Sequence, residues 1–190
     1  MIATESAEPH PLVLASASPQ RRAILERVGA RFTIRPANVD EIGQGDPAEV
    51  AIANALMKAR AARLHEQETV LGVDTLVALH GVIYGKPVDR DAARDTLRAL
   101  GGATHTVCSG LAVLRDEHEQ VAVARTEVSF RELNDATIEW YLAKEEWRGR
   151  AGGYAIQGAG AALVREIRGD YENVVGLPLG TLLDLLPELL

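Results

Sequence analysis

The sequence predicts an α/β fold in which a mixed, strongly twisted sheet is surrounded by helices. Apolar runs typical of buried strands intermix with segments of helical periodicity, without the strict alternation expected of a doubly wound parallel sheet. The length of 190 residues suits one large domain or two small lobes sharing a core. No internal repeat or clear linker divides the chain, so we expect a single domain over residues 1–190.

The first half of the chain predicts four strands and two helices. Ser18 suits a helix N-cap and Pro19 the first helical turn, with Gly29 ending that helix. Asp46-Pro47 opens a second helix, whose inward face we expect to carry Val50, Ala53, Met57, Ala61 and Leu64. The four strands are expected over Leu12–Ala15, Phe32–Ile34, Val70–Leu79 and Val82–Tyr84.

The second half predicts a long hairpin and three further helices. The hairpin strands are Thr106–Leu114 and Val121–Phe130, joined by a polar turn. A strand is expected over Ala161–Ile167, and the glycine-rich segment Gly149–Gly160 is the best candidate for a mobile or cleft-lining loop. The helices are expected from Asp89 through Leu100, over Asp135–Lys144 and over Pro178–Leu186.

Composition narrows the possible partners. The net charge of −7 opposes a broad nucleic-acid surface, although a few cations in one cleft could still bind a small anion. The first ten residues lack the basic start and apolar stretch of a secretory signal, and no apolar run is long enough to cross a bilayer. We therefore expect a cytoplasmic protein without membrane partners. The single cysteine, Cys108, is expected to be a small buried strand residue.

A strand-to-helix turn at Ser16–Arg22 gives the first chemical signal. A helix N-terminus offers unpaired N–H groups and the positive end of the helix dipole, and both favour phosphate. This turn adds the hydroxyls of Ser16 and Ser18 and the pair Arg21-Arg22. On its own, the segment is more simply explained as an ordinary capped helix with solvated arginines.

Asp74 is the most informative residue because it interrupts an apolar strand. An unpaired buried carboxylate costs several kcal/mol, so the sequence predicts a partner such as a lysine, a metal or a ligand cluster. Gly72 lies on the same strand face and leaves room for something to approach. A structural ion pair and a functional carboxylate explain Asp74 about equally well.

Two lysines and an acid complete the candidates. Lys86 follows the strand pair that contains Asp74, Lys58 borders the inward face of the second helix, and Glu41 follows an early strand. Each alone is common on surfaces. Together they offer acids for a hard cation and cations for phosphates. The sequence contains no Walker A loop, H-E-x-x-H motif or G-x-S-x-G elbow.

Seven short motifs follow one another along the chain. They are LASASPQRR at 14–22, VDE at 39–41, KA at 58–59, LGVDT at 71–75, GKP at 85–87, GYAIQG at 153–158 and GDY with NVVGLP between 169 and 178. Each motif is weak alone, but the ordered set is specific. In this order, the motifs resemble those of the Maf-type nucleotide pyrophosphatases, the septum-formation-inhibitor relatives of the house-cleaning enzymes. The resemblance extends from Leu12 to Pro178.

The resemblance implies a two-lobed fold of the Maf and Ham1 ITPase-like type, with the active site in a central cleft, often in a homodimer. It also implies a nucleoside triphosphate diphosphatase that uses Mg²⁺ or Mn²⁺. The family's proton acceptor falls on Asp74, its acid before the second helix on Glu41, and its phosphate-contacting lysines on Lys58 and Lys86. Glu41 and Asp74 would hold the metal, directly or through water. Substrate-binding positions fall on Ser16, Gln20, Arg21, Thr75 and Gln157.

One position departs from the family pattern. Two arginines commonly follow Ser-x-Ser-Pro directly, whereas here Gln20 comes first and the pair is Arg21-Arg22. Thr75 and Gln157 resemble the branch that acts on dTTP and UTP, so we expect those substrates. Two alternatives remain open from the sequence: a nucleotide-binding regulator of cell division with little turnover, and a phosphatase that releases orthophosphate.

Overall fold

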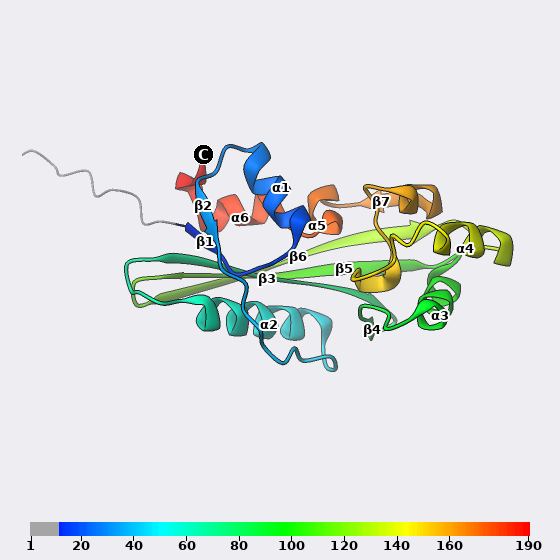
Figure 1. Cartoon of the computed structure of the whole chain (residues 1–190), viewed down its shortest axis with the longest axis horizontal. Helices are drawn as coiled ribbons and strands as arrows, with labels where there is room; N and C mark the ends of the chain where they lie inside the picture. The colour runs from blue at the N-terminus through cyan, green and yellow to red at the C-terminus, as the bar shows by residue number, and fades with distance from the viewer. Residues whose placement is uncertain (1–11) are drawn as a thin grey trace, which may run out of the picture.

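The computed structural model describes residues 12–190, which form one seven-stranded sheet with helices on both faces (Figure 1). The first ten residues, where we expected no secretory signal, lie outside the described part. The strands are β1 (Leu12–Leu14), β2 (Phe32–Ile34), β3 (Thr69–Leu79), β4 (Val82–Tyr84), β5 (Thr104–Arg115), β6 (His118–Phe130) and β7 (Val164–Arg168).

The strand order confirms the predicted mixed sheet. The strands lie in the order β2-β1-β3-β5-β6-β7, and β4 pairs with β3. β1 is parallel to both β2 and β3, whereas all the other pairs are antiparallel. The hairpin of β5 and β6 is longer than predicted because the strands continue to a tight turn at Asp116 and Glu117. Asp116 adopts a φ of 49°, a conformation that aspartate tolerates in turns.

Helices divide the molecule into two lobes, as the resemblance implied. α2 covers one face of the sheet, α1, α5 and α6 cover the other face at the same end, and α3 and α4 lie at the far end (Figure 1). One buried cluster joins Leu14 and Leu25 to Leu182, and another surrounds Tyr141 and Trp147 at the far end. The helices are α1 (Pro19–Arg27), α2 (Pro47–Ala62), α3 (Arg90–Leu100), α4 (Asp135–Leu142), α5 (Tyr171–Val175) and α6 (Leu179–Leu185).

The predicted inward face of α2 is wrong except at Val50. Ala53 and Met57 are half-buried, Ala61 is exposed, and Leu64 lies beyond the helix end with 65% of its surface exposed. The packed face instead consists of small residues and two polar ones: Ala48, Val50, Ala51, Asn54, Ala55, Lys58, Ala59 and Ala62. Periodicity of large side chains therefore pointed to the wrong face.

Two glycines of the sheet explain why small residues face it. A Cβ at Gly72 would lie 2.1 Å from the carbonyl oxygen of Ala55, and one at Gly110 would lie 2.3 Å from the backbone of Ala51. The α2 backbone therefore rests directly on β3 and β5. Gly72 does admit a close neighbour, as its position beside Asp74 suggested, and that neighbour is the helix itself.

Other local predictions hold with small changes. Ser18, Asp46 and Asp89 all cap helices, and Cys108 is buried in β5. The strand expected over Ala161–Ile167 is partly wrong, because a 3₁₀ turn occupies Ala159–Leu163 and β7 begins at Val164. Within residues 12–190, no helix has the length and apolar character needed to cross a membrane.

Candidate active site

A cleft opens beside the part of β3 that has a paired strand on one edge only. β1 pairs with β3 as far as Leu71, and β4 pairs with it from Val77 onwards. Residues 72–76 of β3, between these two pairings, pair with β5 alone among the described strands. The cleft has a volume of about 480 Å³ and is lined by the turn after β1, the start of α1, part of α2 and the glycine-rich loop.

Most of the residues predicted for the site line this one cleft, although they come from distant parts of the sequence. Asp74 does not line it. Its side chain is buried beneath the cleft, behind Lys58. The predicted residues that do line the cleft are Ser16, Gln20, Arg21, Glu41, Lys58, Thr75, Lys86 and Gln157.

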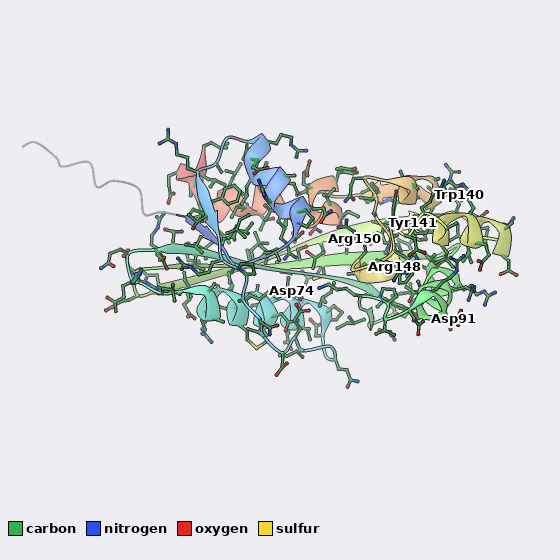
Figure 2. All side chains as sticks on the ribbon, viewed as in Figure 1. Asp74, Asp91, Trp140, Tyr141, Arg148 and Arg150 are labelled. Carbon is green, nitrogen blue, oxygen red and sulfur yellow. The ribbon has the colours of Figure 1, made fainter. Side chains whose placement is uncertain are left out.

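Asp74 points towards α2, on the face of the sheet that this helix covers (Figure 2). Lys58 Nζ lies 2.5 Å from Asp74 Oδ1 and 2.8 Å from Glu41 Oε1. Asn54, one helical turn before Lys58, donates from Nδ2 to Asp74 Oδ2 at 3.0 Å. The predicted partner of Asp74 is therefore Lys58, which links a buried carboxylate to the exposed carboxylate of Glu41.

Arg21 contacts Thr75, the residue that follows Asp74 on β3. Adjacent strand residues point to opposite faces, so Arg21 lies on the opposite side of β3 from Asp74. Its Nε donates to the carbonyl oxygen of Gly176 at 2.9 Å, and its Nη1 to Ser16 Oγ at 2.9 Å. Its Nη2 donates to Thr75 Oγ1 at 3.2 Å. Burial lowers the pKa of Arg21, while the negative charges of Asp74 and Glu41 act against that shift. This cation is fixed by its hydrogen bonds and held near two acids.

The N-terminus of α1 forms one wall of the cleft. Ser18 caps the helix, since its Oγ accepts from the backbone N–H of Arg21 at 3.5 Å, and its own N–H donates to Ser16 Oγ at 3.2 Å. Gln20 lines the cleft, and its Oε1 accepts a 3.1 Å hydrogen bond from Ser18 Oγ. Gln20 is therefore tied to the helix end in this conformation.

Another wall of the cleft includes cations that the sequence did not reveal. Arg148 and Arg150 line the cleft from the loop after α4, on either side of Gly149 (Figure 2). Arg148 is held by an ion pair with Glu145 and by the ring of Trp147, 4.5 Å from its guanidinium carbon. The available signal was the position of the two arginines, with Arg148 directly before the glycine-rich segment and Arg150 within it. That segment does line the cleft, as predicted.

Tyr154, from the same segment, gives this wall a rigid support. Its hydroxyl lies 2.9 Å from His105 Nε2, and both side chains are buried. Desolvation lowers the pKa of His105 to about 4, so the ring is neutral at neutral pH. The support beneath the cleft is consequently uncharged.

The acids of the site fit a metal ion that is bound together with phosphate. Within residues 12–190, no three His, Cys, Asp or Glu side chains gather as a ready-made metal site. Both oxygens of Asp74 already accept hydrogen bonds, whereas Glu41 has 40% of its side chain exposed. Mg²⁺ commonly uses one or two carboxylates and completes its shell with water and substrate phosphates. Glu41 meets that requirement directly, and Asp74 could do so through water or after Lys58 moves.

The fold and the site define an α/β protein whose cleft combines cationic side chains, a helix N-terminus and, in Glu41 and the buried Asp74, a pair of carboxylates. The family model of Maf-like proteins matches residues 11–189. The chain belongs to this Maf-like family.

Three curated relatives match almost the whole chain, and each of them is named a dTTP/UTP pyrophosphatase. The protein from Pyrococcus furiosus is 45% identical over 92% of this chain and 93% of its own. The protein from Pelotomaculum thermopropionicum is 45% identical over 93% of this chain and 95% of its own. The protein from Moorella thermoacetica is 49% identical over 92% of this chain and 93% of its own. The solved Ham1 protein of Staphylococcus aureus aligns with a TM-score of 0.45 and 17% identity, over 64% of this chain and 72% of that one.

Proposed function

We propose that this protein hydrolyses nucleoside triphosphates to the monophosphate and pyrophosphate, with dTTP and UTP as its substrates. The observation that carries the proposal is that Arg21, Lys58 and Lys86 line one cleft, with the buried Asp74 paired to Lys58. The names of the curated relatives support the same reaction and the same bases. By analogy with its family, we also expect a cytoplasmic house-cleaning enzyme that forms a homodimer.

The roles of the basic residues follow from their present partners. Lys58 is shared by two carboxylates, so a triphosphate entering the cleft competes for its ammonium group. Lys86 has no ion pair among the described residues and is available to phosphate. Arg21 is held in place and adds positive charge where the pyrophosphate leaves.

The proton transfer is assigned to Asp74. When Lys58 turns to phosphate, Asp74 Oδ1 becomes available to a water molecule aligned for in-line attack on the α-phosphorus. The water oxygen forms the new P–O bond, its proton passes to the carboxylate, and the bond to the departing pyrophosphate breaks. Glu41 and Asp74 would hold Mg²⁺ or Mn²⁺, which would neutralise phosphate charge and polarise the phosphoryl group. Thr75, Gln157 and Gln20 would contact the nucleoside.

The products test the reaction class. We expect monophosphate and pyrophosphate in equal amounts, and no turnover in excess EDTA, because the cleft offers carboxylates for a cation but no other metal cluster in the described part of the chain. Chromatography of the products with Mg²⁺ and with Mn²⁺ measures this. Stepwise release of orthophosphate would instead identify a phosphatase, and binding without turnover would favour the regulator.

Base preference is tested at Gln20. An arginine there would offer a charged, donor-only side chain, whereas glutamine offers one acceptor and two donors without charge. We expect Gln20→Arg to lower KM for dTTP or UTP more than for purine triphosphates, because selectivity is a difference in transition-state binding. Steady-state kinetics on dTTP, UTP, CTP, GTP and 7-methyl-GTP measure the ratio. An unchanged ratio would assign the preference to Thr75 or Gln157, with Gln20 kept from the base by its hydrogen bond to Ser18.

A further inference from the structure

Asn54 connects two parts of the site that are far apart in the sequence. It is fully buried on the sheet-facing side of α2. Its Nδ2 donates to Asp74 Oδ2 at 3.0 Å and to the carbonyl oxygen of Ile42 at 3.0 Å. Its Oδ1 accepts from the backbone N–H of Ile42 at 2.8 Å. Both amide protons and the carbonyl oxygen are therefore in use.

The hydrogen bonds permit only one orientation of this amide. If the group were flipped, Oδ1 would face the Asp74 carboxylate and the Ile42 carbonyl, and Nδ2 would face the Ile42 N–H. Each contact would then join two acceptors or two donors. A buried amide with unpaired atoms is costly, so the observed orientation is fixed. Packing alone does not require an amide here, because Ala51, Ala55 and Ala59 occupy the same face of the helix.

The partner of Asn54 lies in an irregular segment that carries Glu41. Residues 36–45 contain no helix or strand. Among residues 12–190, the hydrogen bonds and ion pairs that join this segment to the rest are the two Asn54–Ile42 bonds and the Lys58–Glu41 pair. If Lys58 turns to phosphate, the Asn54–Ile42 bonds are the polar contacts that remain.

We propose that Asn54 is a positioning residue, which holds the Glu41 segment and the Asp74 carboxylate in a fixed relation while Lys58 exchanges carboxylate for phosphate. This inference rests on the proposed function, since it assigns a task to a residue that does not line the cleft. It predicts a defect in turnover and not in nucleotide affinity. It also predicts a local change in the Glu41 segment that is visible without substrate.

The test compares Asn54→Ala with Ile42→Ala. Alanine matches its neighbours on the helix face but removes all three hydrogen bonds. Ile42→Ala shortens a side chain that is 43% exposed and leaves the backbone partners of Asn54 intact. For Asn54→Ala we expect kcat to fall about 10–100-fold, as for other residues that orient a reacting group. The KM for dTTP or UTP should stay within about threefold, and amide hydrogen exchange over residues 36–45 should become faster in the substrate-free protein. Ile42→Ala should match the wild type in both.

Three results would overturn the inference: a kcat of Asn54→Ala near that of the wild type, a rise in KM alone, or unchanged exchange over residues 36–45. If Asn54→Ala does not fold, Asn54→Leu serves instead, because it keeps the approximate size of the side chain and removes the hydrogen bonds to Asp74 and Ile42 without adding a charge. The same kcat loss and faster exchange are expected for it. Failure of the proposed function is distinguished by the wild type, which would then not hydrolyse the triphosphates, while hydrogen exchange still reports whether Asn54 anchors the segment.

Discussion

Asp74→Asn is expected to lower kcat by at least ~100-fold, within the usual range for loss of a general base. The amide has nearly the shape of the carboxylate but cannot accept the proton of the attacking water. The protein should remain folded because Lys58 keeps Glu41 as its counter-charge, 2.8 Å away. Since functional sites often reduce stability, we expect the melting temperature to be unchanged or higher. Single-turnover kinetics and thermal melting measure the two effects.

Glu68→Gln is the matched control for Asp74→Asn. Glu68 is also a buried carboxylate with a cationic partner, since Arg35 donates to both of its oxygens at 2.8 Å, but it does not line the cleft. The control should reduce stability and leave kcat unchanged. If Asp74→Asn turns over at nearly the wild-type rate, Asp74 is a structural ion-pair partner and the assigned proton transfer is wrong.

Lys58→Met is expected to reduce both stability and activity. The substitution leaves the Asp74 carboxylate buried without a cation, and breaking a buried pair from one side costs about 3–5 kcal/mol. It also removes a phosphate contact, for which we expect kcat/KM to fall about 100-fold or more, as when one preorganised donor is lost. Urea denaturation measures the free energy of unfolding, and kinetics on dTTP and UTP measure the activity.

The double variant Lys58→Met with Asp74→Asn separates the two effects. Once the buried charge is removed, most of the lost stability should return, while activity should stay low. Lys144→Met is a suitable control, since Lys144 is exposed and its ammonium group lies 5.5 Å from the centroid of the Trp140 ring, away from the cleft lining. A Lys58→Met protein with wild-type stability would show that water already reaches Asp74.

The sequence predicted which residues come together at the cleft better than it predicted the contacts that hold them there. Asp74 could be found because a charge in an apolar strand requires a partner, and Ser18 could be found because capping depends on a few adjacent residues. Strand existence followed from apolar runs, and the errors fell mainly at the ends, as in the strand expected from Ala161. These signals are local in the chain.

The missed features depend on contacts between distant segments. The inward face of α2 could not be derived from the periodicity of large residues, because the deciding contacts are with Gly72 and Gly110. Asn54 gave no signal, since its task depends on Ile42 coming from a segment without regular structure. Arg150 resembled a loop arginine until the fold placed it in the same cleft as the start of α1.

The direct contact of α2 with Gly72 and Gly110 has a consequence for interpreting natural variants of this chain. Lys58 and Asn54 reach Asp74 only because the helix axis lies close to the sheet. A methyl group at either glycine would lift the helix and with it both side chains. Such a variant would be recorded as a loss-of-activity allele although neither glycine touches a nucleotide. Variants can therefore affect this activity by changing the distance between α2 and the sheet, as well as by changing the residues that contact the substrate.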